Sequence, residues 1–386
     1  MVPSNKLIKL ALGSVSLIQP VTGIGQYTLN LSQALTEIHC LDIQHFYGYD
    51  WSSLGAPKNS PKLSLIKKLL KEVIPRPYEV NRLIQQRAFN AGVKAFKPTI
   101  YHEPSFLPLE FDGPTVITVH DLSHIRYPDS HPKERVATLN RRLPKAVENA
   151  QCILTDSNFT KQEILSQFSV KPDKVIVTHL GFSADFYPRQ ISDSQAVISK
   201  YQLIANQYVL AVGTLEPRKN LIQAIRAYSS LPKSFTKKCP LVIVGARGWK
   251  EQAFMKELVP LINDGRALLL GYISSADLPF LYSAAIALIY PSVYEGFGLP
   301  PLEAMACGTT VITTNRSSIP EVVADAGIMV DAGDISATAS AIQTLFEDSI
   351  LHQSLAIKGI KQSANFSWGK CAQLTYEAYL HALDRV

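Results

Sequence analysis

The sequence has little of what marks metal-stapled, disulfide-rich or membrane-spanning proteins. Its five cysteines are odd in number and none forms a Cys-x-x-Cys pair, so neither a disulfide framework nor a structural zinc site is predicted. No apolar run approaches the roughly 20 residues that a membrane-spanning helix needs. No short repeat recurs along the 386 residues, which excludes a solenoid. These absences favour a reducing, cytoplasmic setting.

Acidic residues are scarce in one part of the chain. Residues 58–97 contain ten Lys and Arg against two acidic residues, whereas the net charge of the whole chain is only +6. Six apolar residues between Leu65 and Ile74 share one helical face there, which predicts a basic amphipathic helix. Such a helix either contacts an anionic membrane surface, through residues 62–97, or presents an ordinary solvated lysine face. We do not expect nucleic acid as a partner, because no known binding module is recognisable.

Strands and helices alternate along the whole chain, which predicts parallel, doubly wound sheets. The first half, residues 1–185, opens with a strand expected at Ile8–Val15, which we favour over a signal peptide. A linker with little apolar pattern is expected at 181–200, and a second alternation fills residues 200–367. The chain is long enough for two such domains. We therefore expect an α/β protein with two Rossmann-like domains and a final helix at 368–386.

The stretch 286–314 carries the densest chemistry and reads as strand, loop, short helix and strand. Gly296 and Gly298 allow the backbone to approach a ligand closely. The start of the helix supplies N–H groups and partial positive charge, which suit a phosphate. Glu295 and Glu303 would repel a phosphate unless they pointed at hydroxyl groups. A sugar nucleotide has both parts; the alternative is a corner of the fold with two solvated glutamates.

Two other turns between strand and helix suit a phosphate. Gly23 and Gly25 follow the first predicted strand, where a glycine turn can cradle phosphate, although a plain tight turn fits equally well. Arg218 and Lys219 follow the strand predicted at 208–212. Arginine offers a planar fork for phosphate oxygens and lysine a compact charge, but bases on a surface turn are common.

A titratable pair, His120 and Asp121, ends the strand predicted at 115–119. The carboxyl end of a parallel strand is where an α/β site lies, although a single histidine is more often structural. Asp121 is expected either to fix the imidazole ring or to cap the next turn.

The segment PSVYEGFGLPPLEAMACGTTVI, residues 291–312, resembles the signature of retaining glycosyltransferases of family 4, with its E-x7-E spacing. The one departure from that signature is Thr310, which replaces the usual proline. GTLEPRKN, residues 213–220, also matches a pattern of that family. The resemblance covers nearly all of the C-terminal half and, more loosely, the N-terminal half. It implies the GT-B fold, in which two Rossmann-like domains face a central cleft and the last helix packs back on the first domain.

The resemblance also implies roles for single residues. Glu295 would contact the hydroxyls of the donor sugar and Glu303 the ribose, while Arg218 and Lys219 would grip the diphosphate. The catalytic set is then His120, Glu295, Arg218 and Lys219. The donor-binding positions are Gly23, Gly25, Thr214, Tyr272, Ile273, Gly296, Phe297, Gly298, Leu299 and Glu303. Tyr272 fits a core position as well as a partial stacking surface beside the nucleobase.

The expected reaction is retaining transfer of a hexose from a nucleoside diphosphate sugar to a glycan or lipid-linked acceptor in surface polysaccharide synthesis. GDP-mannose is the first choice of donor, and UDP-glucose, UDP-N-acetylglucosamine or a deoxysugar donor is the alternative. We expect no cofactor and no metal, since the sequence has no Asp-x-Asp motif and its cations can neutralise the leaving group. Three rivals are a sugar-nucleotide epimerase, a nicotinamide-dependent dehydrogenase, which would lack its fingerprint here, and a non-catalytic sugar-binding module. The protein would be cytoplasmic or peripheral on the inner face of the cell membrane.

Overall fold

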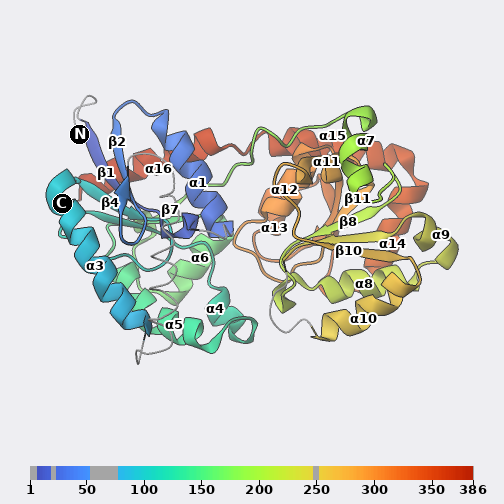
Figure 1. Ribbon diagram of the computed structural model, residues 1–386, viewed down its shortest axis with the longest axis horizontal. Helices are drawn as coiled ribbons and strands as arrows, with labels where there is room; N and C mark the ends of the chain where they lie inside the picture. The colour runs from blue at the N-terminus through green and yellow to red at the C-terminus, as the bar shows by residue number, and fades with distance from the viewer. Residues whose placement is uncertain (1–6, 19–22, 53–76, 247–251, 386) are drawn as a thin grey trace.

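The computed structural model describes residues 7–18, 23–52, 77–246 and 252–385. Two α/β lobes lie side by side, the first built from the N-terminal half of the chain and the second from the C-terminal half (Figure 1). The amphipathic helix predicted at 65–74 lies outside the described residues.

The first lobe contains a seven-stranded sheet in the order β3-β2-β1-β4-β5-β6-β7. All pairs are parallel except β2 with β3, which closes one edge antiparallel. Its strands are β1 Ile8–Gly13, β2 Leu41–Phe46, β3 Trp51–Ser52, β4 Ile100–Glu103, β5 Thr115–Thr118, β6 Cys152–Thr155 and β7 Val175–Val177. Its helices are α1 Gly23–Thr36, α3 Pro77–Phe96, α4 Ser123–Arg126, α5 Lys133–Asn149 and α6 Asn158–Gln167.

The second lobe contains a six-stranded sheet in the order β10-β9-β8-β11-β12-β13, in which every pair is parallel. Its strands are β8 Val209–Val212, β9 Leu241–Val244, β10 Ala267–Gly271, β11 Ala287–Tyr290, β12 Thr310–Thr314 and β13 Gly327–Val330. Its helices are α7 Ile191–Lys200, α8 Leu221–Ser230, α9 Lys233–Lys238, α10 Gln252–Asn263, α11 Leu278–Ser283, α12 Leu299–Ala306, α13 Ile319–Val323, α14 Ile335–Glu347 and α15 Ser349–Ser363. The predicted fold class, with two doubly wound parallel sheets, is confirmed.

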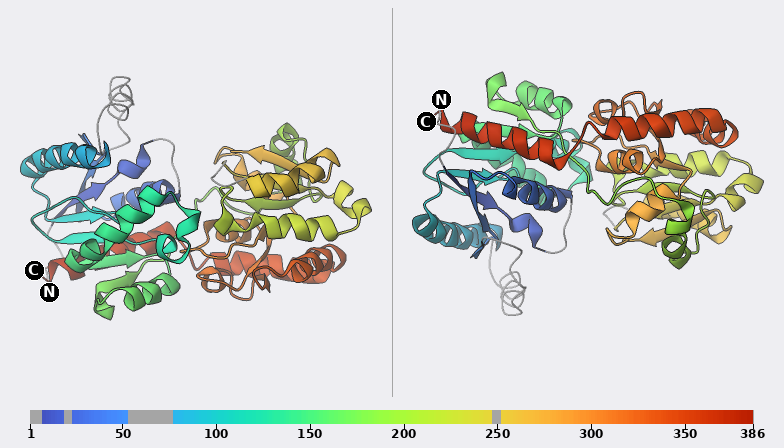
Figure 2. Two further views of the ribbon diagram at one scale, coloured as in Figure 1. Left: turned by 90° about the horizontal axis from the view of Figure 1, so that it is seen from below. Right: turned by 90° about the horizontal axis from the view of Figure 1, so that it is seen from above.

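The last helix, α16 (Trp368–Leu383), returns from the second lobe and packs against α1 and β6 of the first (Figure 2). The chain therefore crosses between the lobes twice. The two crossings touch, because a Cβ added to Gly181 in the first would lie 2.1 Å from the backbone nitrogen of Trp368 in the second. Only glycine fits this contact.

The linker and the start of the first helix differ from the predictions. The linker is shorter than expected, because residues 191–200 form α7, which packs against α11. Gly23 and Gly25 lie in the first turn of α1 rather than in a loop before it. The side chain of Ser157 caps α6 by accepting from the Thr160 N–H.

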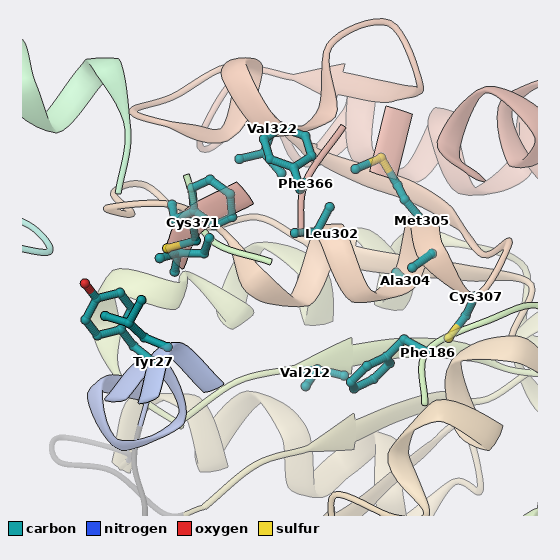
Figure 3. Packing of buried hydrophobic residues seen from close by; sticks show 14 of the residues in the cluster. Tyr27, Phe186, Val212, Leu302, Ala304, Met305, Cys307, Val322, Phe366 and Cys371 are labelled. Carbon is teal, nitrogen blue, oxygen red and sulfur yellow. The ribbon is translucent and has the colours of Figure 1, made fainter. Parts of the chain in front are cut away.

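The largest apolar cluster joins the two lobes. It combines Leu302 and Met305 of α12 with Phe366 and with Cys371 of α16, and it extends to Tyr27 of α1 (Figure 3). These side chains are all less than a tenth exposed, so the segments that carry the predicted site are anchored in a shared core. Among the described helices, none combines the length and apolarity that crossing a bilayer requires.

Candidate functional site

The predicted residues meet where the carboxyl ends of strands from both sheets face each other. The segment 291–298 follows β11 and reaches the first lobe, where the Ser157 hydroxyl donates to the Gly296 carbonyl over 2.7 Å. A Cβ on Gly296 would lie 1.9 Å from the His120 carbonyl oxygen. Glycine is therefore required for this approach, and it brings His120 next to the segment that carries Glu295.

Tyr294 anchors the same segment against the first lobe. Its hydroxyl accepts from the Leu122 N–H over 2.9 Å and donates to Glu163. Its ring packs 5.4 Å from Tyr127 and 5.8 Å from Phe159, centroid to centroid. The lobes are thus in a closed arrangement around the predicted site.

Glu295 is 6% exposed and is the centre of a buried ion cluster. It accepts from Arg218 Nη1 at 2.8 Å and Lys219 Nζ at 2.7 Å. The hydroxyls of Tyr290, at 2.8 Å, and Ser292 also donate to it. Burial alone would raise the pKa of this carboxyl, but Arg218 and Lys219 outweigh that effect and lower it to about 2. Glu295 is therefore fully ionised at neutral pH.

Arg218 is held by more than one carboxylate. Its Nη2 also donates to Glu216 over 2.6 Å, and the carboxylate of Asp121 also acts on its charge. Burial lowers the pKa of Lys219. Arg218 Nε is buried and finds no acceptor among the described residues. A buried donor without a partner is costly.

His120 is buried and both of its ring nitrogens are engaged. Nδ1 lies 2.8 Å from Asp156 Oδ2, and Nε2 lies 2.8 Å from the Pro104 carbonyl oxygen. A carbonyl only accepts, so Nε2 carries a proton. Burial opposes a charge on the ring, but the Asp156 carboxylate and the Pro104 carbonyl outweigh it, and the pKa of His120 lies above its ordinary value. The contacts with Asp156 and Pro104 fix the orientation of the ring.

Asp121 takes one of its two predicted roles. Its Oδ1 accepts from the N–H and the hydroxyl of Ser123, over 2.9 and 2.6 Å, so it caps the next turn. The ring of His120 is fixed by Asp156 instead. Asp156 follows β6, which pairs with β5, and a carboxylate at the end of a neighbouring strand was the available signal.

Glu303 lies in α12 and is partly buried. Burial raises its pKa to about 8, against a weaker opposing effect from the Tyr282 hydroxyl, which donates over 3.2 Å. The carboxyl is therefore largely protonated at neutral pH and can donate a hydrogen bond as well as accept one. The helix begins at Leu299, and Pro300 and Pro301 have no N–H. These two positions therefore cannot donate to a phosphate.

The remaining predicted donor-binding residues differ in how much of their side chains is exposed to solvent. Tyr272 is 77% exposed, which excludes the core position and leaves a surface on which a ring can stack. Ile273 and Phe297 are 7% and 4% exposed and belong to the apolar core, so only their backbone could contact a ligand. Gly298 adopts φ +119°, a conformation that favours glycine, at the N-cap of α12.

Gly23 lies at an open position, since an added Cβ would meet nothing within 4 Å. Thr214, beside Gly213 at the end of β8, and Leu299 at the start of α12 are both partly exposed. The roles of all these residues toward a donor stay predictions.

Sequence reasoning missed several residues that hold the cluster in place. Tyr290 ends β11 and was read only as an apolar strand residue, although its hydroxyl also accepts from Lys219 over 2.8 Å. Ser318 donates to the carbonyls of Glu295 and Phe297, over 2.9 and 2.7 Å, and so fixes the loop. Across residues 7–18, 23–52, 77–246 and 252–385, no three His, Cys, Asp or Glu side chains gather as a metal site would require.

Comparison with known proteins agrees with this geometry. Residues 21–186 match the family described as Glycosyltransferase Family 4, and residues 199–362 match Glycosyl transferases group 1. The O-antigen chain mannosyltransferase B of Escherichia coli is 36% identical over 96% of this chain and 99% of its own length. The O-antigen chain mannosyltransferase RfbU of Salmonella typhimurium is 27% identical over 84% of this chain and 87% of its own.

Among solved structures, sucrose-phosphate synthase from Thermosynechococcus elongatus superimposes with a TM-score of 0.77 at 22% identity, over 98% of this chain and all of that one. This likeness supports the fold. Together with the sequence matches over both lobes, it shows that the chain belongs to the family 4 glycosyltransferases of the GT-B fold.

Proposed function

We propose that this glycosyltransferase moves mannose from GDP-mannose to a hydroxyl of a growing glycan or lipid-linked acceptor, with retention at the anomeric carbon and without a metal ion. The observation that carries the proposal is the buried cluster of Arg218, Lys219 and Glu295 at the junction of the lobes. The printed names of two relatives, both O-antigen chain mannosyltransferases, support mannose as the sugar.

The chemistry of the cluster suits a departing diphosphate. Negative charge grows on the leaving oxygens, and Arg218 and Lys219 can neutralise it in a site with little water. In the structure Glu295 accepts hydrogen bonds from both cations. Binding of a diphosphate would therefore release Glu295 from them, and the freed carboxylate could accept from sugar hydroxyls.

Retention and independence of metal ions are proposals that rest on the family resemblance and on this pair of cations. Activity should survive EDTA, and restoration by magnesium of a lost activity would contradict metal-free transfer. The configuration of the new linkage can be read by NMR from the anomeric coupling of the product. An inverted product would overturn retention.

The donor is tested by thermal unfolding with a panel of nucleoside diphosphates. The base that stabilises the protein identifies the donor class, since a ligand that binds only the folded state raises its melting temperature. We expect the largest shift with GDP. A larger shift with UDP would favour the alternative, a UDP-glucose or UDP-N-acetylglucosamine donor. Product formation without an acceptor would favour an epimerase.

Contact with an anionic membrane is also a proposal. The described part of the basic stretch, α3, exposes Leu83 and Ile84 together with Arg87 and Lys94. Apolar and basic side chains of this kind support interfacial binding. We expect sedimentation with anionic liposomes at low salt and release at high salt; absence of binding at low salt would refute the contact.

A further inference from the structure

A pocket of about 640 Å³ lies on the first lobe, between α3, the segment 107–113 and the second half of α5. Small-molecule sites typically have volumes of roughly 300–1,000 Å³. Thr115, at the amino end of β5, is in its wall. His120 follows the carboxyl end of the same strand, five residues later, and so lies roughly 16 Å away. The pocket is therefore separate from the cleft that holds Glu295.

Four cations from two helices surround this pocket: Arg82 of α3 and Arg141, Arg142 and Lys145 of α5. Arg141 Nη2 donates to Glu79 over 2.6 Å, and Arg142 donates to the same carboxylate. Since Arg141 and Lys145 are four residues apart, they share one face of α5.

Further bonds hold the arginines in fixed positions around the opening. Arg82 donates to the Pro108 carbonyl on the opposite wall. The side chain of Arg141 is 64% exposed although it is bonded to Glu79. A guanidinium has five N–H donors, so this side chain can bond a carboxylate and a ligand together.

Cations outnumber carboxylates among the described residues that line the pocket, with Arg82, Arg141, Arg142 and Lys145 against Glu110. Arginine forks match the geometry of phosphate oxygens. This lining therefore suits a ligand that carries a phosphate group.

Part of the pocket lining is apolar. It consists of Leu107, Leu109 and Phe111 of the segment 107–113 and Ala146 of α5, and Leu109 and Phe111 pack in a cluster with Phe89. A fully hydrated anion gains nothing from such a wall, whereas a hydrocarbon chain is stabilised there by burial. We propose that this pocket binds a phosphate group that carries an apolar chain. Two molecules offer this chemistry: a lipid-linked acceptor and an anionic lipid of the bilayer.

Calorimetric titration with dodecyl phosphate, below its micelle concentration, tests the pocket. We expect saturable binding, at least tenfold weaker binding of inorganic phosphate, and at least a tenfold loss of affinity for dodecyl phosphate in the double variant Arg141→Gln/Lys145→Gln. Both side chains are exposed, so this variant should fold. Lys145→Glu is a second, single variant with the same expected direction.

Lys133→Gln is the matched control, because this exposed lysine lies on the same helix but outside the pocket. It should bind dodecyl phosphate as the parent protein does. Absence of binding, or equal affinity in the parent and both pocket variants, would overturn the proposal.

Two further assays on the double variant distinguish a bilayer lipid from a lipid-linked acceptor as the ligand. If a bilayer lipid occupies the pocket, sedimentation with phosphatidylglycerol vesicles falls at least tenfold and dodecyl phosphate competes with the vesicles. If the acceptor occupies it, vesicle binding is unchanged and KM for a lipid-linked acceptor rises at least tenfold. No change in either assay would overturn the proposal. Turnover of donor with a short soluble acceptor should be unchanged in both cases, so a wrong donor assignment is seen separately.

Discussion

Replacing Glu295 by glutamine tests whether this carboxylate neutralises Arg218 and Lys219 until a donor arrives. The ordinary pKa of a glutamate is 4.5, and in the cluster it falls to about 2. Each pKa unit equals about 1.4 kcal/mol, so the ionised side chain stabilises the fold by about 3 kcal/mol above pH 5. For a domain of 150–250 residues, 1 kcal/mol shifts Tm by about 2–4 °C. We expect Glu295→Gln to lower Tm by about 6–12 °C at pH 7.

The same variant should respond more strongly to nucleotide. Without Glu295, Arg218 and Lys219 lose the carboxylate that they share, and a diphosphate no longer has to displace it. GDP should therefore raise the Tm of Glu295→Gln by more than it raises the parent Tm, even though kcat falls by about 10²–10³. Differential scanning fluorimetry with and without GDP measures both shifts.

The pH dependence fixes the sign of this effect. The folded pKa of Glu295 is below the unfolded value, so its contribution is full above pH 4.5 and is lost as pH falls toward 2. The difference in Tm between parent and variant should shrink over that range. Glu377→Gln, an exposed site on α16, serves as the control. A variant as stable as the parent at pH 7, or one that GDP stabilises less, would refute the reasoning.

Four further changes have defined outcomes. Lys219→Ala should lower kcat by about 10²–10³ in steady-state assays; an unchanged kcat would remove it from the site. Glu303→Gln should raise stability at pH 9 but not at pH 4, because the folded pKa of about 8 exceeds the unfolded value and stability is lost as pH rises through it; urea unfolding at both pH values measures this. Asp156→Asn should lower the pKa of His120, which NMR measures from the titration of its imidazole resonances, and should move the pH–rate profile to lower pH. An unchanged titration would contradict the pairing of His120 with Asp156. Gly296→Ala should force the lobes apart and increase the radius of gyration in X-ray scattering, since its Cβ would lie 1.9 Å from the His120 carbonyl; unchanged scattering would argue against the closed contact.

Much of the fold could be predicted because buried parallel strands leave continuous apolar runs. The fully buried β6 and β9 are runs of this kind. α7 lies within the predicted linker, because its residues are mostly polar. α15 gives a weak signal, because Ile350 and Ile357 are 81% and 60% exposed, which blurs the pattern of one apolar face. Both helices depend on tertiary contacts that a local pattern does not contain.

The sequence predicts the site best where charged side chains follow the carboxyl ends of parallel strands. The family resemblance placed Glu295, Arg218 and Lys219 around one donor, and in the structure they are in direct contact. The partnership of His120 with Asp156 was not predicted, since it depends on β5 and β6 being neighbours, which follows from sheet order. The position of Phe297 in the core also depends on packing, against Phe366 at 5.6 Å.

The paired crossings at Gly181 and Trp368 have a mechanical consequence. A single flexible linker would allow one lobe to rotate and translate freely relative to the other. Two linker segments in contact form a hinge, which restricts the relative motion mainly to rotation about one axis. Each closure then brings the Glu295 segment back to the same place beside His120. The orientational search that a loosely tethered pair would repeat in every catalytic cycle is largely removed by the path of the chain itself.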